Sequence, residues 1–256
     1  LGELKLSDVR VEWNAAARQA VLEGYIEDRT QKLVFRVVGL NDNRTCHRSN
    51  YRMDIMDALK TLPISFTGEL HQIRIIAVSV KEEEVLPNLP NGIDLVVENG
   101  RILFSLVSVQ LKDVKASALP IPFNYHHVAL RMSVKDYQYN DSRQNQGVYF
   151  YHSYTNKPLI VAGGKAITAY NLHSAEIKHV EPVFDLNSGE NFIRFALDTT
   201  TPRIGEQDLF NRIQRLDRAY FVQGENLYRT KVSRKEWPIK WAECYAFETN
   251  LFNDYK

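Results

Sequence analysis

Apolar and polar residues alternate through most of the chain, and this two-residue period is typical of strands. The alternating runs fall within residues 8–38, 64–67, 71–80, 95–111, 126–134, 183–186, 192–198, 219–222, 227–232 and 239–249. Short polar or glycine-containing turns separate them, without a regular alternation of strands and long helices. The pattern therefore favours a mainly β fold, either a barrel or a sandwich.

Two segments have helical spacing instead. Met53–Leu62 places its apolar residues on one face and ends before Pro63, and Glu206–Arg218 has the clearest amphipathic pattern in the chain. Asn99-Gly100 separates two strand-like runs and accepts the positive φ angles of a tight type I′ turn. We therefore expect short helices and a hairpin at these places.

The stretch from Gly147 to Lys178 combines an aromatic strand, a turn, an apolar segment and a second strand. Gly163-Gly164 interrupts the apolar segment but lacks the spacing of a phosphate-binding loop. Because several elements are concentrated here, we expect this stretch to be the structural centre of the fold.

The polar, turn-rich segment from residue 39 to residue 50 is the best candidate for a linker. It predicts a division into an N-terminal β-rich extension, residues 1–58, and a strand-rich domain, residues 59–256.

Composition narrows the classes of function. The formal net charge of +1 gives no overall attraction to nucleic acid, and no apolar run approaches the ~20 residues of a membrane span. Cys46 and Cys244 are too far apart in the chain for a redox or zinc motif. The opening residues contain no secretory pattern, so a cytoplasmic location is expected. We predict no cofactor, no nucleic acid partner and no membrane partner.

Three separated stretches resemble, in the same order, the YqjF-like family of uncharacterised bacterial proteins, a domain of unknown function. They are LPNGIDLVVENGRILFSLVSVQLKDVK, GVYFYHSYTNKPLIVAGGKA and LDRAYFVQGENLYRTKVSRKEWP. That family is similar to acetoacetate decarboxylase. The resemblance implies a mainly β (α+β) fold: an acetoacetate decarboxylase-like antiparallel β barrel around a central cavity, with a few short helices and an N-terminal β extension.

The chain departs from the decarboxylases where their mechanism requires two adjacent lysines. Leu172 and His173 stand at the matching positions, and the chain contains no Lys-Lys pair. The first of those lysines forms a Schiff base with the substrate. The charge of the second lysine lowers the pKa of the first, so that its amine is a free nucleophile. His127 falls near the position where such enzymes carry a carboxylate. The resemblance therefore does not extend to Schiff-base decarboxylation.

The residues that we predict to bind a ligand are Arg131, Lys165, His127, His173, Tyr149, Tyr151 and Tyr170. Arg131 lies in an alternating strand and can hold a carboxylate through two hydrogen bonds. Lys165 is a candidate anion anchor, the resemblance places both histidines near the cavity, and the tyrosines supply aromatic walls. Surface exposure or ordinary strand packing is the alternative for each. No metal site is predicted, because the histidine spacings match no known ligand motif.

Three hypotheses of function follow. The first is a barrel that binds a small organic, carboxylate-bearing molecule without decarboxylase chemistry. The second is a lyase or hydrolase that uses Lys165, Arg131 or a cavity histidine. The third is a non-catalytic interaction protein that forms homo-oligomers through free strand edges.

Overall fold

The computed structural model describes residues 4–7, 21–26, 31–39, 64–116, 119–135, 146–167, 172–203, 218–223, 226–233 and 240–251. The strands are β1 Leu4–Ser7, β2 Val21–Ile26, β3 Gln31–Gly39, β4 Ile64–Lys81, β5 Val97–Glu98, β6 Arg101–Ala116, β7 Leu119–Lys135, β8 Gln146–Thr155, β9 His173–Ser174, β10 Glu176–Val180, β11 Val183–Asn187, β12 Phe192–Arg203, β13 Arg218–Gln223, β14 Asn226–Ser233 and β15 Lys240–Thr249. The helical elements among these residues are α2 Glu82–Val85, η1 Leu86–Asn88 and α3 Pro158–Ile167. The expected mainly β fold with a few short helices is confirmed.

The alternation of apolar and polar residues located most described strands correctly. The run at residues 126–134 lies inside β7, and residues 183–186 and 192–198 lie inside β11 and β12. Asn99 and Gly100 have φ angles of 51° and 70°, as a turn of the expected kind requires, and they join β5 to β6. The predicted helix at residues 53–62 lies outside the described residues. The same is true of residues 206–217 of the helix predicted over residues 206–218 and of residues 40–50 of the linker predicted over residues 39–50, whereas Arg218 begins β13 and Gly39 ends β3.

Two elements differ from the expected pattern. The runs at residues 64–67 and 71–80 form one strand, β4, because irregular register near Gly68 and Gln72 lets the strand bend without ending. A Cβ at Gly68 would lie 2.9 Å from the Val114 side chain, so only glycine allows this approach of β4 to β6. The segment with Gly163-Gly164 forms α3, so the two glycines are inside a helix.

The strands share one sheet. Their order is β10–β11–β12–β15–β1–β2–β4–β3–β14–β13–β8–β7–β6–β5, β9 pairs with β8, and β4 also pairs with β6. The first half of β4 pairs with β3 and the second half with β2, while β6 runs along its other edge. The described N-terminal strands therefore belong to the same sheet as the rest of the chain. The division at residue 58 stays a prediction.

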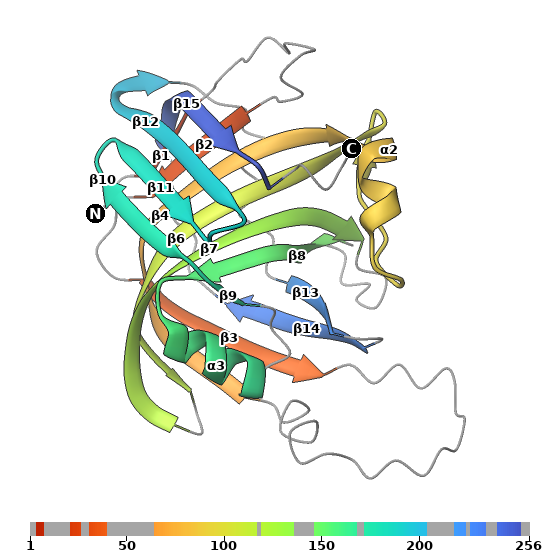
Figure 1. Cartoon of the computed structure of the whole chain (residues 1–256), viewed down its shortest axis with the longest axis vertical. Coiled ribbons are helices and arrows are strands. Elements are labelled where there is room, and N and C mark those ends of the chain that lie inside the picture. Colours follow the sequence, from red (N-terminus) through yellow and green to blue (C-terminus); the bar gives the residue numbers. More distant parts are fainter. Residues whose placement is uncertain are drawn as a thin grey trace.

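Hydrophobic side chains pack on both faces of the long strands β4, β6 and β7. The first core lies between these strands and the segment β11–β12–β15, which folds across them (Figure 1). Ile76, Phe104, Leu130, Phe184 and Phe195 are among its fully buried members. The second core lies on the opposite face and includes Ile75, Val109 and Leu111. The two faces therefore have separate environments, which matters for the polar residues described below.

None of the helices in the described ranges combines the length and the hydropathy that are needed to cross a bilayer.

Candidate functional site

A patch of nine residues lies on one face of three neighbouring strands, β6, β7 and β8. Strand register places them in three rows, one residue from each strand: Ser105–Arg131–Phe150, Val107–Ala129–Ser153 and Val109–His127–Thr155. Residues opposite each other in paired strands project to the same side of the sheet. We call these nine residues the β7 patch. It brings together two of the predicted ligand-binding residues, Arg131 and His127.

Arg131 lies at one end of the β7 patch and is held there by a serine. Its Nε donates a hydrogen bond to Ser105 Oγ at 3.2 Å, across the pairing of β6 with β7. The side chain is half-buried, and Ser105 beside it is buried. A guanidinium that is oriented by a neighbour and not fully covered can place its terminal N–H groups against a carboxylate.

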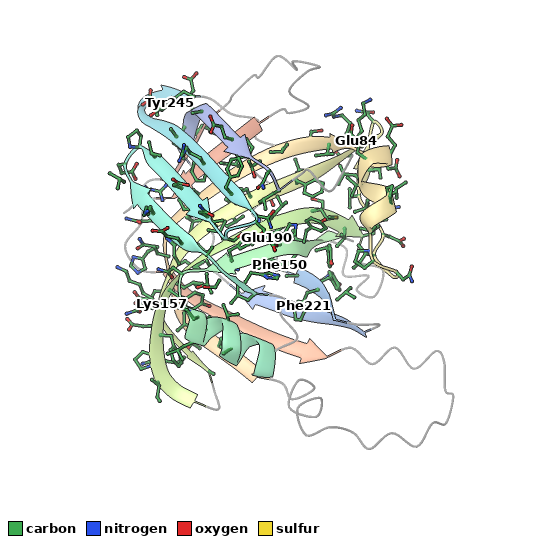
Figure 2. The ribbon with its side chains drawn as sticks, viewed as in Figure 1. Glu84, Phe150, Lys157, Glu190, Phe221 and Tyr245 are labelled. Carbon is green, nitrogen blue, oxygen red and sulfur yellow. The ribbon has the colours of Figure 1, made fainter. Side chains whose placement is uncertain are left out.

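An irregularity in β8 completes the patch. The register shifts between Leu130 and Arg131, which face His152 and Phe150 respectively. The extra residue is Tyr151, and it brings both Phe150 and Ser153 to the patch side. Figure 2 shows Phe150 on β8, and Phe221 on the neighbouring strand β13. Bulges of this kind re-aim side chains, and here the result is an aromatic ring beside Arg131.

His127 lies at the opposite end of the patch, four residues before Arg131 in β7. Its ring is 6.3 Å from the Phe150 ring, and Thr155 lies across from it on β8. Burial, and then the nearby His126 and Arg131, lower the pKa of His127 to about 3. The imidazole is therefore neutral at physiological pH, and can donate one hydrogen bond and accept another.

The structure places the other predicted residues elsewhere. Tyr149 is buried in the first core, on the face opposite to the β7 patch, where burial and then Tyr151 raise its pKa to about 12. Tyr151 also packs against that core, and its ring meets the His152 ring at 4.2 Å. His173 is exposed on β9. Lys165 belongs to α3, but its side chain lies outside the described part, as does Tyr170.

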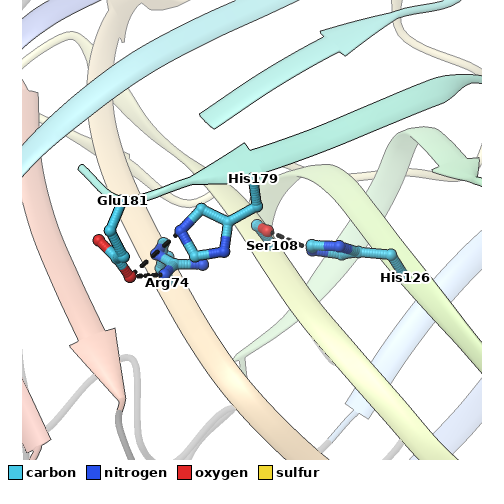
Figure 3. Close-up of polar contacts among 5 residues, drawn as sticks. All are labelled: Arg74, Ser108, His126, His179 and Glu181. Carbon is cyan, nitrogen blue, oxygen red and sulfur yellow. Dashed lines mark hydrogen bonds and ion pairs between the residues drawn. The ribbon is translucent and has the colours of Figure 1, made fainter. Parts of the chain in front are cut away.

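Figure 3 shows a second polar cluster. Its residues on the long strands lie on the face that carries the first core, opposite to the β7 patch. Arg74 on β4 is 2% exposed, and its Nη2 donates to Glu181 Oε1 at 2.5 Å. The same oxygen lies 3.1 Å from His179 Nε2. Ser108 Oγ and His126 Nε2 form a buried hydrogen bond of 2.8 Å beside them. We call these five residues the Arg74 cluster.

The Arg74 cluster connects the β10–β11 hairpin to the long strands. Glu181 lies in the turn of the hairpin and His179 near the end of β10, whereas Arg74, Ser108 and His126 belong to β4, β6 and β7. Phe184 of β11 is close to both histidines, with its ring centre 5.7 Å from that of His126 and 6.5 Å from that of His179. The cluster thus pairs a buried positive charge with a carboxylate from the hairpin, and we expect this contact to help hold the hairpin in place.

Arg74, Ser108 and Glu181 are not among the functional residues that the sequence predicts. A signal for Arg74 exists, because it is a charged residue within the apolar run Ile73–Val78, and a buried charge must find a partner. Glu181 is 107 residues away and gives no comparable signal. Only the fold could reveal this pair.

The histidines predict a pH dependence of stability. Burial, and then Arg74 and His179, lower the pKa of His126 to about 4, and the pKa of His127 is about 3. Below pH 6.5 the unfolded chain takes up protons that the folded protein does not, so the free energy of unfolding should fall as pH falls. Each histidine can contribute up to about 1.4 kcal/mol per pH unit over this window, until the folded protein is protonated as well.

Urea unfolding between pH 7 and pH 4 measures this slope. His127→Gln should make it shallower than in the unaltered protein, and His173→Gln, a change at an exposed histidine, should leave it unchanged. Equal slopes for all three proteins would contradict the assignment.

The described residues contain no group of three or more His, Cys, Asp or Glu side chains arranged to hold a metal ion.

Two parts of the chain match models of protein families. Residues 1–36 match the YscD/CdsD-like Bon-like domain 1. A comparison with curated proteins found no match. Among solved structures, the chain is similar to acetoacetate decarboxylase from Legionella pneumophila, with 12% sequence identity and a TM-score of 0.41 over 84% of this chain and 81% of that chain. Residues 68–256 match DUF2071, described as an uncharacterized conserved protein, which confirms the resemblance to an uncharacterised family. The chain belongs to the DUF2071 family.

Proposed function

We propose that this protein binds a small organic molecule through a carboxylate, on the β7 patch, without Schiff-base decarboxylase chemistry. The observation that carries the proposal is the placement of Arg131. Its guanidinium is oriented by Ser105, is half-buried and lies beside the Phe150 ring. Small-molecule sites combine apolar walls with a few oriented polar groups of this kind.

The sheet pairing supports an enclosed site. Strands β3, β14, β13, β8, β7 and β6 pair in that order, and β4 pairs with both β3 and β6. We propose that these seven strands form the barrel that the family resemblance implies, with the β7 patch on its inner side. The second core and Phe221 would then belong to the same interior.

The absence of the lysine pair supports the exclusion of imine chemistry. Leu172 is buried and His173 is exposed, and neither side chain can form a Schiff base with a carbonyl compound. Binding without that reaction is therefore the function that the residues of this chain support best.

Titration calorimetry with a series of monocarboxylates from butanoate to decanoate tests the proposal. We expect at least one to bind the unaltered protein, and Arg131→Gln to weaken that binding at least about tenfold, because a hydrogen bond to a charged group is lost. Arg101→Gln is the matched control, since Arg101 also donates to a serine, Ser79, but lies at the start of β6.

Two results would contradict the proposal. One is that no carboxylate in the series binds to the unaltered protein. The other is that Arg131→Gln and Arg101→Gln weaken binding equally, because the carboxylate would then not be held at the β7 patch.

A further inference from the structure

The two ends of the β7 patch differ in charge. Arg131 at one end is a permanent cation, whereas the imidazole at the other end, His127, is neutral. They occupy the same face of one strand at positions four residues apart, which corresponds to roughly 13 Å along a strand. Three residues of the patch carry hydroxyl groups: Ser105 beside Arg131, Thr155 beside His127, and the buried Ser153 in the middle row.

Apolar side chains separate the two ends. Val107 and Phe150 are half-buried and keep part of their surface accessible, while Ala129 and the polar Ser153 of the middle row are buried. The accessible surface therefore changes from cationic to apolar to neutral polar along β7. A ligand that matches it has the same three parts in the same order.

On the basis of the proposed function, we propose that the ligand is a bipolar monocarboxylic acid of medium length. Its carboxylate would contact Arg131, its apolar middle would cover Phe150 and Val107, and an uncharged hydroxyl or carbonyl at its far end would bond to His127. The spacing of Arg131 and His127 along β7 sets the length of the ligand. An extended chain of roughly eight carbons covers most of the ~13 Å between the backbone positions of the two residues.

The far end should be uncharged for two reasons. A second carboxylate at the far end would lose hydration on binding. His127 does not take up a proton near neutral pH, so the patch would offer this carboxylate no positive charge at that end. A hydroxyl, by contrast, donates and accepts, as the neutral imidazole does. A methyl group in its place forms no hydrogen bond with the imidazole.

The test compares 8-hydroxyoctanoate with nonanoate on the unaltered protein by titration calorimetry. The two acids have equal numbers of non-hydrogen atoms and differ only in a terminal hydroxyl against a methyl group. We expect 8-hydroxyoctanoate to bind about fivefold more tightly, although the hydrophobic effect alone favours nonanoate. Octanedioate, with a charged far end, should bind more weakly than either.

Variants assign the preference to its residue. His127→Phe should reverse it, so that nonanoate binds more tightly, while Arg131→Gln should weaken both acids by the same factor. Thr155→Val removes the hydroxyl group beside His127 and keeps the size of the side chain nearly the same. It serves as a second variant, in which the preference should be smaller, if His127→Phe fails to fold.

The outcomes separate this inference from the function on which it rests. If neither acid binds, the proposed function itself fails. If both bind and nonanoate binds as tightly as the hydroxy acid or more tightly, a carboxylate site exists but the bipolar ligand is wrong. If the preference for the hydroxy acid persists unchanged in His127→Phe and Thr155→Val, the far end does not lie at His127 and the inference is overturned.

Discussion

Replacing Glu181 by alanine is expected to lower the free energy of unfolding by about 2–3 kcal/mol, because it removes the carboxylate that contacts a buried guanidinium. Arg74 is 2% exposed and Glu181 is 52% exposed. The loss of one partner from a fully buried pair costs about 3–5 kcal/mol, and partial exposure of the carboxylate reduces that figure. Urea unfolding at pH 7 measures the effect.

The position of the buried charge makes the reciprocal change milder. Arg74→Met removes the charge that needs compensation and leaves Glu181 in contact with water, so it should cost less than Glu181→Ala. In the double variant Arg74→Met/Glu181→Ala the second change should add little. Glu176→Ala is the matched control, because Glu176 pairs with Lys178 on the surface of the same hairpin. If Glu181→Ala costs no more than Glu176→Ala, the Arg74 cluster does not hold the hairpin.

Phe184→Ala should destabilise the protein more than Glu181→Ala does, by about 3–5 kcal/mol, because it creates a cavity in the first core. Phe184 is fully buried, stacks on Phe195 with ring centres 4.6 Å apart and touches both histidines of the Arg74 cluster. The loss would therefore remove packing from the hairpin and from the polar cluster together.

Thermal and urea unfolding of Phe184→Ala measure this effect, and Phe192→Ala is the control, since Phe192 on the adjacent strand is exposed. A loss below about 1 kcal/mol for Phe184→Ala would mean that the hairpin does not pack on the long strands as described. Phe184→Leu, which retains most of the apolar volume, should fall between the two.

Local pattern was sufficient to predict much of the sheet. Alternation located β7 and β11, and Asn99-Gly100 located the hairpin between β5 and β6. These features depend on the two-residue period of side chains and on residue types that accept particular backbone angles, and both can be read from a short stretch of sequence. His126 and His127 are adjacent in β7 and lie on opposite faces of that strand, as the two-residue period of a strand requires.

Features that depend on contacts between distant parts of the chain cannot be predicted from the local pattern of residues. The bend of β4 needs the approach of Val114 to Gly68, and the pairing of Arg74 with Glu181 needs the hairpin to fold across β4. The register shift at Tyr151 decides that Phe150 joins Arg131 while Tyr149 packs in the first core. Simple alternation cannot detect such a shift. The sequence therefore predicts Tyr149 as a ligand-binding residue together with Arg131, although Tyr149 faces the other side of the sheet.

The central claim is that a carboxylate-bearing ligand contacts the β7 patch, and nuclear Overhauser effects between bound ligand and protein test it most directly. In protein labelled at its methyl groups and phenylalanine rings, the alkyl protons of bound octanoate should show nuclear Overhauser effects to the Phe150 ring and to the Val107 methyl groups. They should show none to Leu130 or Val128, which lie on the opposite face of β7 in the first core. Effects to Leu130 and Val128 but not to Phe150 and Val107 would contradict the account.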